Sequence, residues 1–200
     1  LMSEYPEVRA LFNQTHQQQG TQARALANAV LKYARHIDNL GALGQLPAQI
    51  IQKHVSLQIL PEHYPLVGTC LLRAIREVLG EAIATDAVIE AWGAAYWQLA
   101  NILIGAESAQ YAQNAAAPGG WRGARQFAVI EKTVESTEIT SFVLAPVDGG
   151  AVLNYQPGQY LGLKLLINGQ EVRRNYSLSQ KADGRTLRIS VKREPNGVLS

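Results

Sequence analysis

Apolar residues recur every three to four positions through the first 117 residues of the chain. This spacing places them along one face of a helix, and the segment is rich in Ala, Leu and Gln, which favour helices. The pattern predicts four main helices, beginning near Thr21, Pro47, Pro61 and Thr85. On the third of these, the predicted inward face consists of Leu66, Leu71, Ile75 and Val78.

After the helix-breaking sequence Pro118-Gly119-Gly120, the pattern changes to short alternating runs rich in Val, Ile, Thr and Tyr. The turn sequences VDGG, QPG, NGQ and ADGR separate these runs. Five antiparallel strands are predicted, at 126–131, 139–146, 159–166, 173–179 and 187–192. The chain is therefore predicted to be multi-domain, with a helical domain over 1–117 and a small antiparallel β-barrel or sandwich over 118–200.

Composition narrows the possible partners of the protein. Hydrophobic residues make up 47% of the 200 and charged residues 17%, so the chain can bury a core. The net charge of +2, with scattered Lys and Arg, gives no reason to expect a nucleic-acid partner. No apolar run reaches the length of about 18 residues typical of a membrane span. The single cysteine, Cys70, excludes a disulfide within the chain and is typical of the reducing cytoplasm.

His54 is the histidine that falls on an apolar helical face, beside Ile51 and Leu57. The other three, His16, His36 and His63, have polar neighbours and are expected to be solvated. No second His or Cys lies near His54 at the spacing of a zinc site. A haem needs one axial ligand and an apolar slot, which a helical domain can supply. The spacing alone leaves open whether His54 is a hydrogen-bonded core residue or such a ligand.

Two further polar residues have the same ambiguity. If Tyr64 and Glu107 both reach one ring nitrogen of His54, they fix its tautomer and make the imidazole more electron-donating. The alternative is that Tyr64 packs at a helix start and that Glu107 is a solvated residue at a helix end.

In the second half, the sequence VRRNYSLSQ brings Arg174, Asn175, Tyr176 and Ser177 together, and PGQY ends in Tyr160. An aromatic ring beside Arg and Ser on one strand suits a flat ring system carrying a phosphate. An ordinary strand with Tyr on one face is the alternative. The glycine-rich motifs GxGxxG and GxxxxGK[ST] do not occur in the sequence.

Seven segments, taken in order, resemble the flavohaemoglobins, which are bacterial and fungal nitric oxide dioxygenases. They are LFNQTHQQQGTQARALANAV, QKHVSLQILPEHYPLVGTCLL, EAWGAAYWQLANILI, PGGWRGARQF, ITSFVLAPVDGGAV, PGQYLGL and RRNYSLS. The resemblance covers essentially all 200 residues. It implies a globin-like helical domain followed by an FAD-binding barrel of the ferredoxin-reductase type.

The resemblance also implies roles for individual residues. His54 matches the proximal ligand of the haem b iron, and Lys53 matches a position thought to influence the haem and flavin redox potentials. Tyr64 and Glu107 match the catalytic pair that hydrogen-bonds this histidine. The other implied haem-site residues are Phe12, Gln22 and Leu26. The implied FAD-site residues are Tyr160, Arg174, Asn175, Tyr176, Ser177, Gly197, Val198 and Ser200.

The implied activity is that of a nitric oxide dioxygenase, in which haem-bound O2 reacts with NO to give nitrate and NO is detoxified. Electrons pass from NAD(P)H through FAD to the haem. O2 and NO are the expected substrates, and a cytoplasmic monomer is expected. The distal tyrosine and the nicotinamide-binding domain of the family have no match, so the chain is expected to be an internal fragment. The alternative is an oxygen-binding or oxygen-sensing globin whose barrel is an interaction module.

Overall fold

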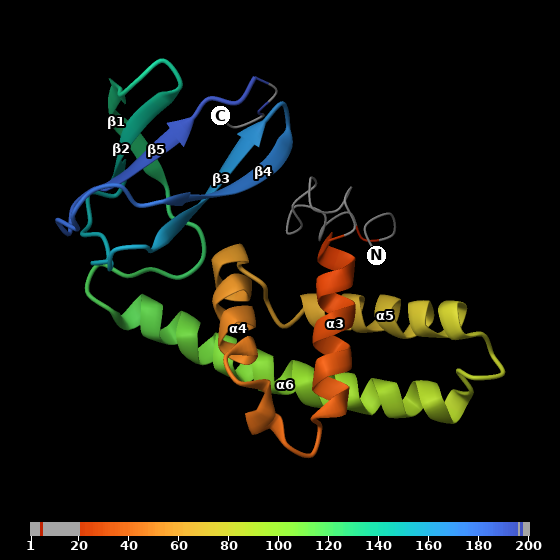
Figure 1. Ribbon diagram of the computed structural model, residues 1–200. Coiled ribbons are helices and arrows are strands. Elements are labelled where there is room, and N and C mark those ends of the chain that lie inside the picture. The colour runs from red at the N-terminus through yellow and green to blue at the C-terminus, as the bar shows by residue number, and fades with distance from the viewer. Residues whose placement is uncertain (1–4, 6–20, 196, 198–200) are drawn as a thin grey trace. The chain divides into compact units, whose positions relative to one another are not determined.

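The computed structural model describes residues 5, 21–195 and 197, and shows helices followed by strands (Figure 1). The chain divides into two compact units, residues 1–109 and 110–200. This order confirms the predicted class, a helical domain followed by antiparallel β structure. The division falls within the last helix, and the predicted domain boundary after residue 117 stays a prediction. None of the helices in the described part has both the length and the apolar character of a membrane span.

The predicted helices are present, and each begins within two residues of its predicted start. They are α3 (Thr21–Arg35), α4 (Leu46–Leu57), α5 (His63–Leu79) and α6 (Asp86–Ala116), with the short 3-10 helix η1 (Leu40–Leu43) before α4. Pro47 lies in the first turn of α4, where its missing N–H costs nothing. Gln58 ends α4 in the left-handed conformation, and its N–H donates to the carbonyl oxygens of His54 and Val55.

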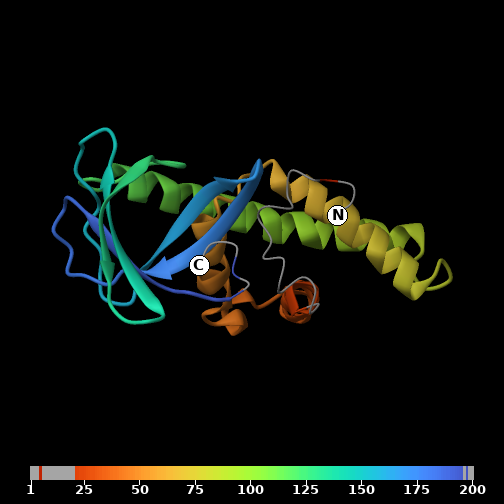
Figure 2. The same cartoon turned by 90° about the horizontal axis from the view of Figure 1, so that it is seen from above.

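The core of the helical unit lies between α5 and α6, which run alongside each other while α3 crosses them steeply (Figures 1 and 2). Its buried members are Tyr64, Tyr96, Ala100 and Leu103. Ile50 and Ile51 of α4 pack against this cluster, so α4 is held on the same core. Two of the four buried members are tyrosines, whose hydroxyl groups need hydrogen-bond partners inside the protein.

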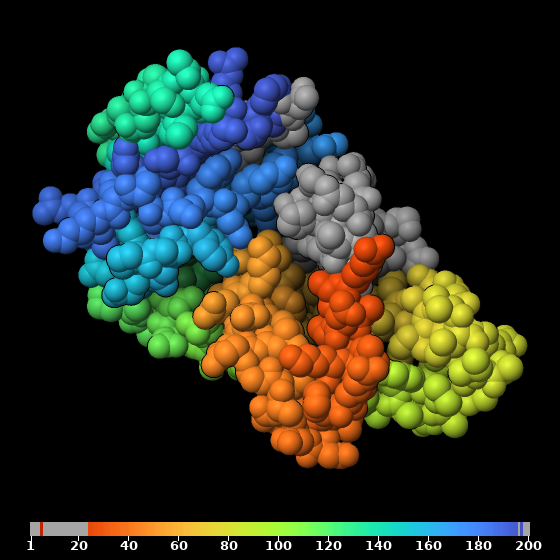
Figure 3. All heavy atoms as spheres, viewed as in Figure 1, coloured from red at the N-terminus to blue at the C-terminus, as the bar shows by residue number. Residues whose placement is uncertain are grey.

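The prediction that Val78 points inward is wrong. Its residue is 82% exposed, because it lies in the last turn of α5, one residue before the helix ends. Figure 3 shows the end of α5 and the turn after it, in yellow, at the surface of the protein. Helical periodicity continues to the end of a helix even where no neighbouring element remains to cover the face.

Five strands in the described residues form two antiparallel sheets. The first sheet has the order β1-β2-β5, with β1 (Phe127–Val134), β2 (Ile139–Pro146) and β5 (Leu187–Lys192). The second is the hairpin of β3 (Tyr160–Ile167) and β4 (Gln170–Ser177). A bridge between Leu178 and Ile189 connects the two sheets.

Strand β4 begins three residues earlier than predicted. The reason is the turn Asn168-Gly169, in which both residues have positive φ, 51° and 77°. This pair forms the two-residue connection that matches the twist of a hairpin, so pairing continues up to Ile167 and Gln170.

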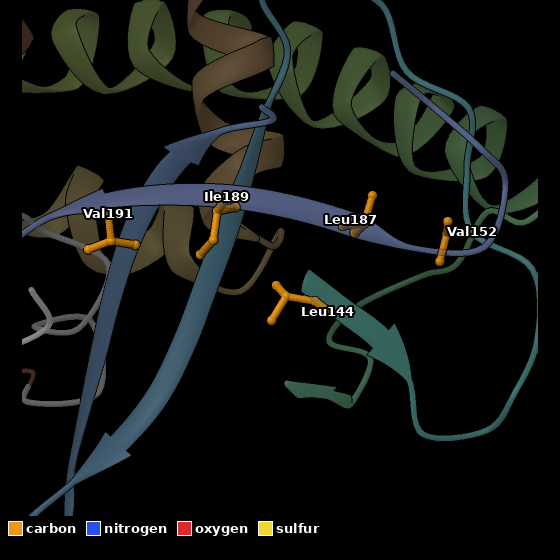
Figure 4. Packing of buried hydrophobic residues seen from close by; sticks show 5 residues of the cluster. All are labelled: Leu144, Val152, Leu187, Ile189 and Val191. Atoms are coloured by element: carbon orange, nitrogen blue, oxygen red, sulfur yellow. The ribbon is translucent and has the colours of Figure 1, made fainter. Parts of the chain in front are cut away.

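The buried cluster at the core of the β unit is aliphatic (Figure 4), and partly buried aromatic rings such as Trp121 and Phe142 pack against it. Leu187, Ile189 and Val191 alternate along β5 and therefore share one face of the sheet. Leu144 of β2 lies on this face, and Val152, 2% exposed, covers it from the loop after β2.

Candidate functional site

Three polar side chains of the helical unit meet in a buried network. The Nδ1 atom of His54 lies 2.7 Å from Glu107 Oε1 and 3.1 Å from the Tyr64 hydroxyl oxygen. The Tyr64 hydroxyl donates to the same Glu107 oxygen at 2.7 Å. Glu107 is 2% exposed and Tyr64 6%, so the carboxylate has exchanged water for these two donors. The network joins α4, α5 and α6 at one point.

The hydrogen bonds assign the proton of the imidazole. A carboxylate only accepts, so Nδ1 carries the proton that is donated to Glu107. In the neutral ring the other nitrogen, Nε2, then presents its lone pair. Within the described part of the chain, no hydrogen bond uses Nε2. The His54 side chain is 31% exposed, so the imidazole is not sealed inside the core.

A second tyrosine fixes Tyr64 in place. The Tyr96 hydroxyl of α6 donates to the Tyr64 carbonyl oxygen at 2.7 Å. The Tyr96 ring lies over Gly68 so closely that a Cβ atom there would be 2.6 Å from Tyr96 Cε1. Burial raises the pKa of Tyr96 well above its usual value, which keeps the hydroxyl protonated as a donor. Tyr96 therefore sets the position of Tyr64 relative to the helix that carries Glu107.

Other residues that the resemblance assigned to the haem site are only partly described. Phe12 and the side chain of Gln22 lie outside the described residues. Leu26 of α3 is 40% exposed, and Lys53, next to His54 on α4, is also exposed. The structure does not bring Leu26 or Lys53 into the buried network, and their roles stay predictions.

The predicted flavin residues lie on the β3–β4 hairpin, divided between its two faces. Tyr160 pairs with Ser177, so these two share a face, and Asn175 lies on that face as well. Arg174 and Tyr176 lie on the other face. Tyr176 packs against the aliphatic core, and burial raises the pKa of its hydroxyl.

The remaining flavin positions are at the end of the described chain. Gly197 is exposed, and its N–H donates to the Glu194 carbonyl oxygen. Val198 and Ser200 lie outside the described residues. One face of the hairpin thus presents the Tyr160 ring and the Ser177 hydroxyl, which suit a flat ring and a phosphate, whereas the Arg174 guanidinium group lies on the other face.

Comparison with known proteins gives the family. Residues 1–103 match the globin family and residues 126–200 match the oxidoreductase FAD-binding domain. The whole chain is 67% identical over 200 residues to a flavohemoprotein of Burkholderia sp. (strain TH2), covering 51% of that protein's length.

The chain belongs to the flavohaemoglobin family. It spans about half the length of the curated relatives it matches. A crystal structure of a flavohemoglobin from Malassezia yamatoensis, with bound FAD and haem, is similar over the whole chain, with a TM-score of 0.83 and 29% identity, and 51% of that protein is covered. A bacterial globin from Campylobacter jejuni is 38% identical, with a TM-score of 0.51, over 56% of this chain and 78% of that one.

The residues of this flavohaemoglobin fit the haem of the family. Among the described residues, no group of three or more His, Cys, Asp or Glu side chains is arranged to hold a bare metal ion. The buried network instead offers one imidazole nitrogen, oriented from behind by a carboxylate and a hydroxyl. A single oriented imidazole suits an iron whose other four in-plane ligands come from a porphyrin.

Sequence reasoning missed two contributions to the flavohaemoglobin network. Tyr96 of α6 was not among the candidate residues; its signal was a tyrosine in the middle of a long predicted helix, where a buried hydroxyl needs a partner. His63, expected to be solvated, is of intermediate exposure and also has a local partner, because its Nδ1 accepts the Leu60 N–H at 2.9 Å. The sequence carried a signal for this bond: a polar residue two positions after Pro61 can reach back to close the first turn of a helix.

Proposed function

We propose that this chain is the haem-binding and part of the flavin-binding region of a nitric oxide dioxygenase that uses NAD(P)H as its electron donor. The observation that carries the proposal is the buried network behind His54. Glu107 and Tyr64 both lie at Nδ1, and Nε2 points away from them with its lone pair available. A core histidine with a purely structural role would have no need of a buried carboxylate, whose burial is costly.

Each residue of the network has a separate task in this proposal. Glu107 accepts the Nδ1 proton, which fixes the tautomer and the ring orientation and makes Nε2 more electron-donating. Tyr64 donates to the same Glu107 oxygen and so helps to hold the carboxylate in place behind the imidazole. A strongly donating imidazole favours reaction of an iron-held ligand over its simple storage.

When bound, haem supplies the iron at which O2 and NO are converted to nitrate, and FAD converts hydride from NAD(P)H into single electrons. In this proposal Arg174 binds a phosphate of the flavin cofactor through its guanidinium group. Tyr160 and Ser177, which pair across the hairpin, contact the flavin from their shared face. Lys53, exposed beside His54, adds a positive charge close to the proximal residue.

We also propose that the protein acts as a cytoplasmic monomer without a nucleic-acid partner. The single cysteine and the small net charge of +2 support this view. Multi-angle light scattering of the purified protein tests the monomer, which a doubled mass at micromolar concentration would contradict.

The test of the function compares two tyrosine variants in protein that carries haem and FAD. Tyr64→Phe removes the hydroxyl that donates to Glu107 and is expected to lower NAD(P)H-driven NO consumption about tenfold, while haem content is retained. Tyr33→Phe is the matched control, since the buried Tyr33 hydroxyl makes no hydrogen bond with the described residues. Equal turnover in wild type and Tyr64→Phe would contradict the proposal.

A second experiment distinguishes the oxygen-binding or oxygen-sensing alternative. Arg174→Ala and Ser177→Ala are expected to lower flavin content and NO consumption together. If both variants keep the flavin content and the turnover of the wild type, the β unit is not the electron donor to the haem. The alternative, with the β unit as an interaction module, would then be favoured.

A further inference from the structure

The turn between α4 and α5 connects two members of the buried network. His54 lies in the last turn of α4 and Tyr64 is the second residue of α5. Only residues 58–62 lie between the two helices. The conformation of this turn therefore decides where the Tyr64 backbone begins, and with it how far the Tyr64 hydroxyl reaches.

Two reciprocal hydrogen bonds close the turn. The His63 N–H donates to the Leu60 carbonyl oxygen at 3.0 Å, and the Leu60 N–H donates to His63 Nδ1 at 2.9 Å. Both backbone polar groups of Leu60 are thus bound by a single residue. The Glu62 side chain, at the usual capping position, makes no capping hydrogen bond. His63 consequently does the work that a capping side chain does in other helices.

The arrangement is one half of a capping box. In that motif, the side chain of the third helical residue accepts the N–H of the residue before the helix, and Glu or Gln usually fills the position. Here the same spacing begins in the turn before α5. Leu60 takes the place of the residue before the helix, Pro61 suits the first position, and His63 is three residues after Leu60. The Tyr64 N–H then donates to the Pro61 carbonyl oxygen at 3.2 Å, which continues the same tight turn.

We propose that His63 is a positioning residue for the proximal network, holding the turn so that the Tyr64 hydroxyl reaches both His54 and Glu107. The step from turn to hydroxyl is short, because Tyr64 follows His63 directly and its N–H is part of the turn. The Tyr64 carbonyl is fixed separately by Tyr96. The turn and Tyr96 thus fix Tyr64 from its two sides. The effect on the reaction rests on the proposed function, but the clamp on Leu60 does not.

The direct test is amide hydrogen exchange at Leu60 in the purified protein. His63→Ala removes the acceptor and is expected to speed this exchange about tenfold, the change that corresponds to loss of one hydrogen bond of about 1.4 kcal/mol. His63→Gln offers a neutral acceptor of the capping-box type and is expected to remain within about threefold of wild type. His36→Ala removes an imidazole outside this turn and should leave Leu60 unchanged. Unchanged Leu60 exchange in His63→Ala, or a failure of Gln to restore protection, would overturn the proposal.

The second readout follows the clamp to the network. In haem-loaded protein, the iron–histidine stretching band in the resonance Raman spectrum reports how strongly the imidazole donates to the iron. His63→Ala is expected to shift this band in the same direction as Tyr64→Phe and by less, while His63→Gln restores it. In a Tyr64→Phe background, His63→Ala should add no further shift. An unchanged band in His63→Ala, or an equal additional shift in the Tyr64→Phe background, would contradict the positioning role.

The two readouts separate the possible failures. A protein that binds no haem would give no iron–histidine band in any variant, which contradicts the proposed function. The Leu60 exchange experiment would still decide whether His63 closes the turn.

Discussion

The two units of the molecule use polar side chains in opposite ways. In the helical unit, the polar contacts with large sequence separation converge on one buried place, where His54, Tyr64 and Glu107 meet. In the β unit, the buried cluster is aliphatic, and the buried polar side chain described there, Ser141, bonds to a neighbouring serine, Ser190, and not to a charged group. Its ion pairs, such as Arg125–Asp148 and Arg188–Glu135, lie at or near the surface.

This difference indicates that the buried polar groups of the helical unit form a functional site, whereas the ion pairs of the β unit support the structure. Burying a carboxylate costs free energy that only well-placed donors offset, so a buried polar cluster is kept where its chemistry is used. Half-exposed ion pairs cost little and contribute little, and they serve to fasten loops. The Arg125 guanidinium shows the second use: it binds both Asp148 oxygens and the Ala151 carbonyl, and lies against the Trp121 ring.

The largest expected difference in stability is between variants of two glutamates, one in each unit. Glu107→Ala removes from the core the carboxylate to which both the Tyr64 hydroxyl and His54 Nδ1 donate, and should lower the free energy of unfolding by about 3 kcal/mol. Glu135→Ala removes an acceptor of Arg188 from a half-exposed site and should change it by less than about 0.5 kcal/mol. Urea unfolding followed by far-UV circular dichroism measures both. If both variants lost the same free energy of unfolding, the contrast between the buried network and the ion pairs near the surface would be wrong.

A glycine pair in the helical unit gives the next largest effect. Gly68→Ala places a methyl group against the Tyr96 ring and is expected to cost about 1–3 kcal/mol of unfolding free energy. Gly105→Ala, on α6, meets no atom within 4 Å and should stabilise the helix by about 0.5–1 kcal/mol. Thermal unfolding separates them by the direction of the shift in Tm. If Gly68→Ala raised Tm, the Tyr96 ring would have room to move away from α5, and its close contact with Gly68 would not be required.

For the ion pair between Arg125 and Asp148 in the β unit, we expect a smaller effect on stability that depends on pH. Hydrogen bonds from Arg125 and from the Gly150 N–H lower the pKa of Asp148. A lowered carboxylate pKa contributes stability above the unfolded-state pKa of about 3.9 and loses it as the pH falls through the folded-state value. Asp148→Asn should therefore be less stable than wild type at pH 7, and the difference should shrink below pH 4. Urea unfolding followed by far-UV circular dichroism at each pH measures this, and a difference that grows in acid would contradict it.

The smallest effect is expected at Val78, where the sequence-based prediction was wrong. Val78→Lys changes an exposed position near the C-terminus of α5, so its unfolding free energy should stay within about 0.5 kcal/mol of wild type. A lysine there also interacts favourably with the negative end of the helix. A loss above about 2 kcal/mol, typical of a buried aliphatic residue, would show that this face is covered.

Much of the fold could be predicted because each element carries its own local signal. Strand β2 was predicted with the same bounds that the structure gives, since alternating residues and the VDGG turn mark its ends. Strand β4 began earlier than predicted because the Asn168-Gly169 turn allows pairing up to its edge. Val78 was misplaced because the cover over a helical face depends on tertiary neighbours, which periodicity does not contain.

The site was predictable only in part. Periodicity placed His54 on an apolar face but left its role open. Tyr64 and Glu107 were candidate partners with alternatives of their own, and the family resemblance implied their roles. The structure brings these three side chains into contact although Glu107 lies 53 residues from His54. Tyr96 and Gly68 escaped notice because their fit depends on how α5 packs on α6. The hydrogen bond of His63 was not predicted, because its polar neighbours suggest solvent and do not show that its ring accepts a backbone N–H only three residues away.

The central claim is that the buried network presents Nε2 of His54 to the haem iron. The most direct measurement is the absorption spectrum of the haem-reconstituted protein, compared with that of His54→Ala in the absence and presence of added imidazole. We expect a Soret band typical of histidine ligation in the wild type, its loss in His54→Ala, and its return when imidazole occupies the vacated position. A Soret band that is unchanged by His54→Ala would contradict the account.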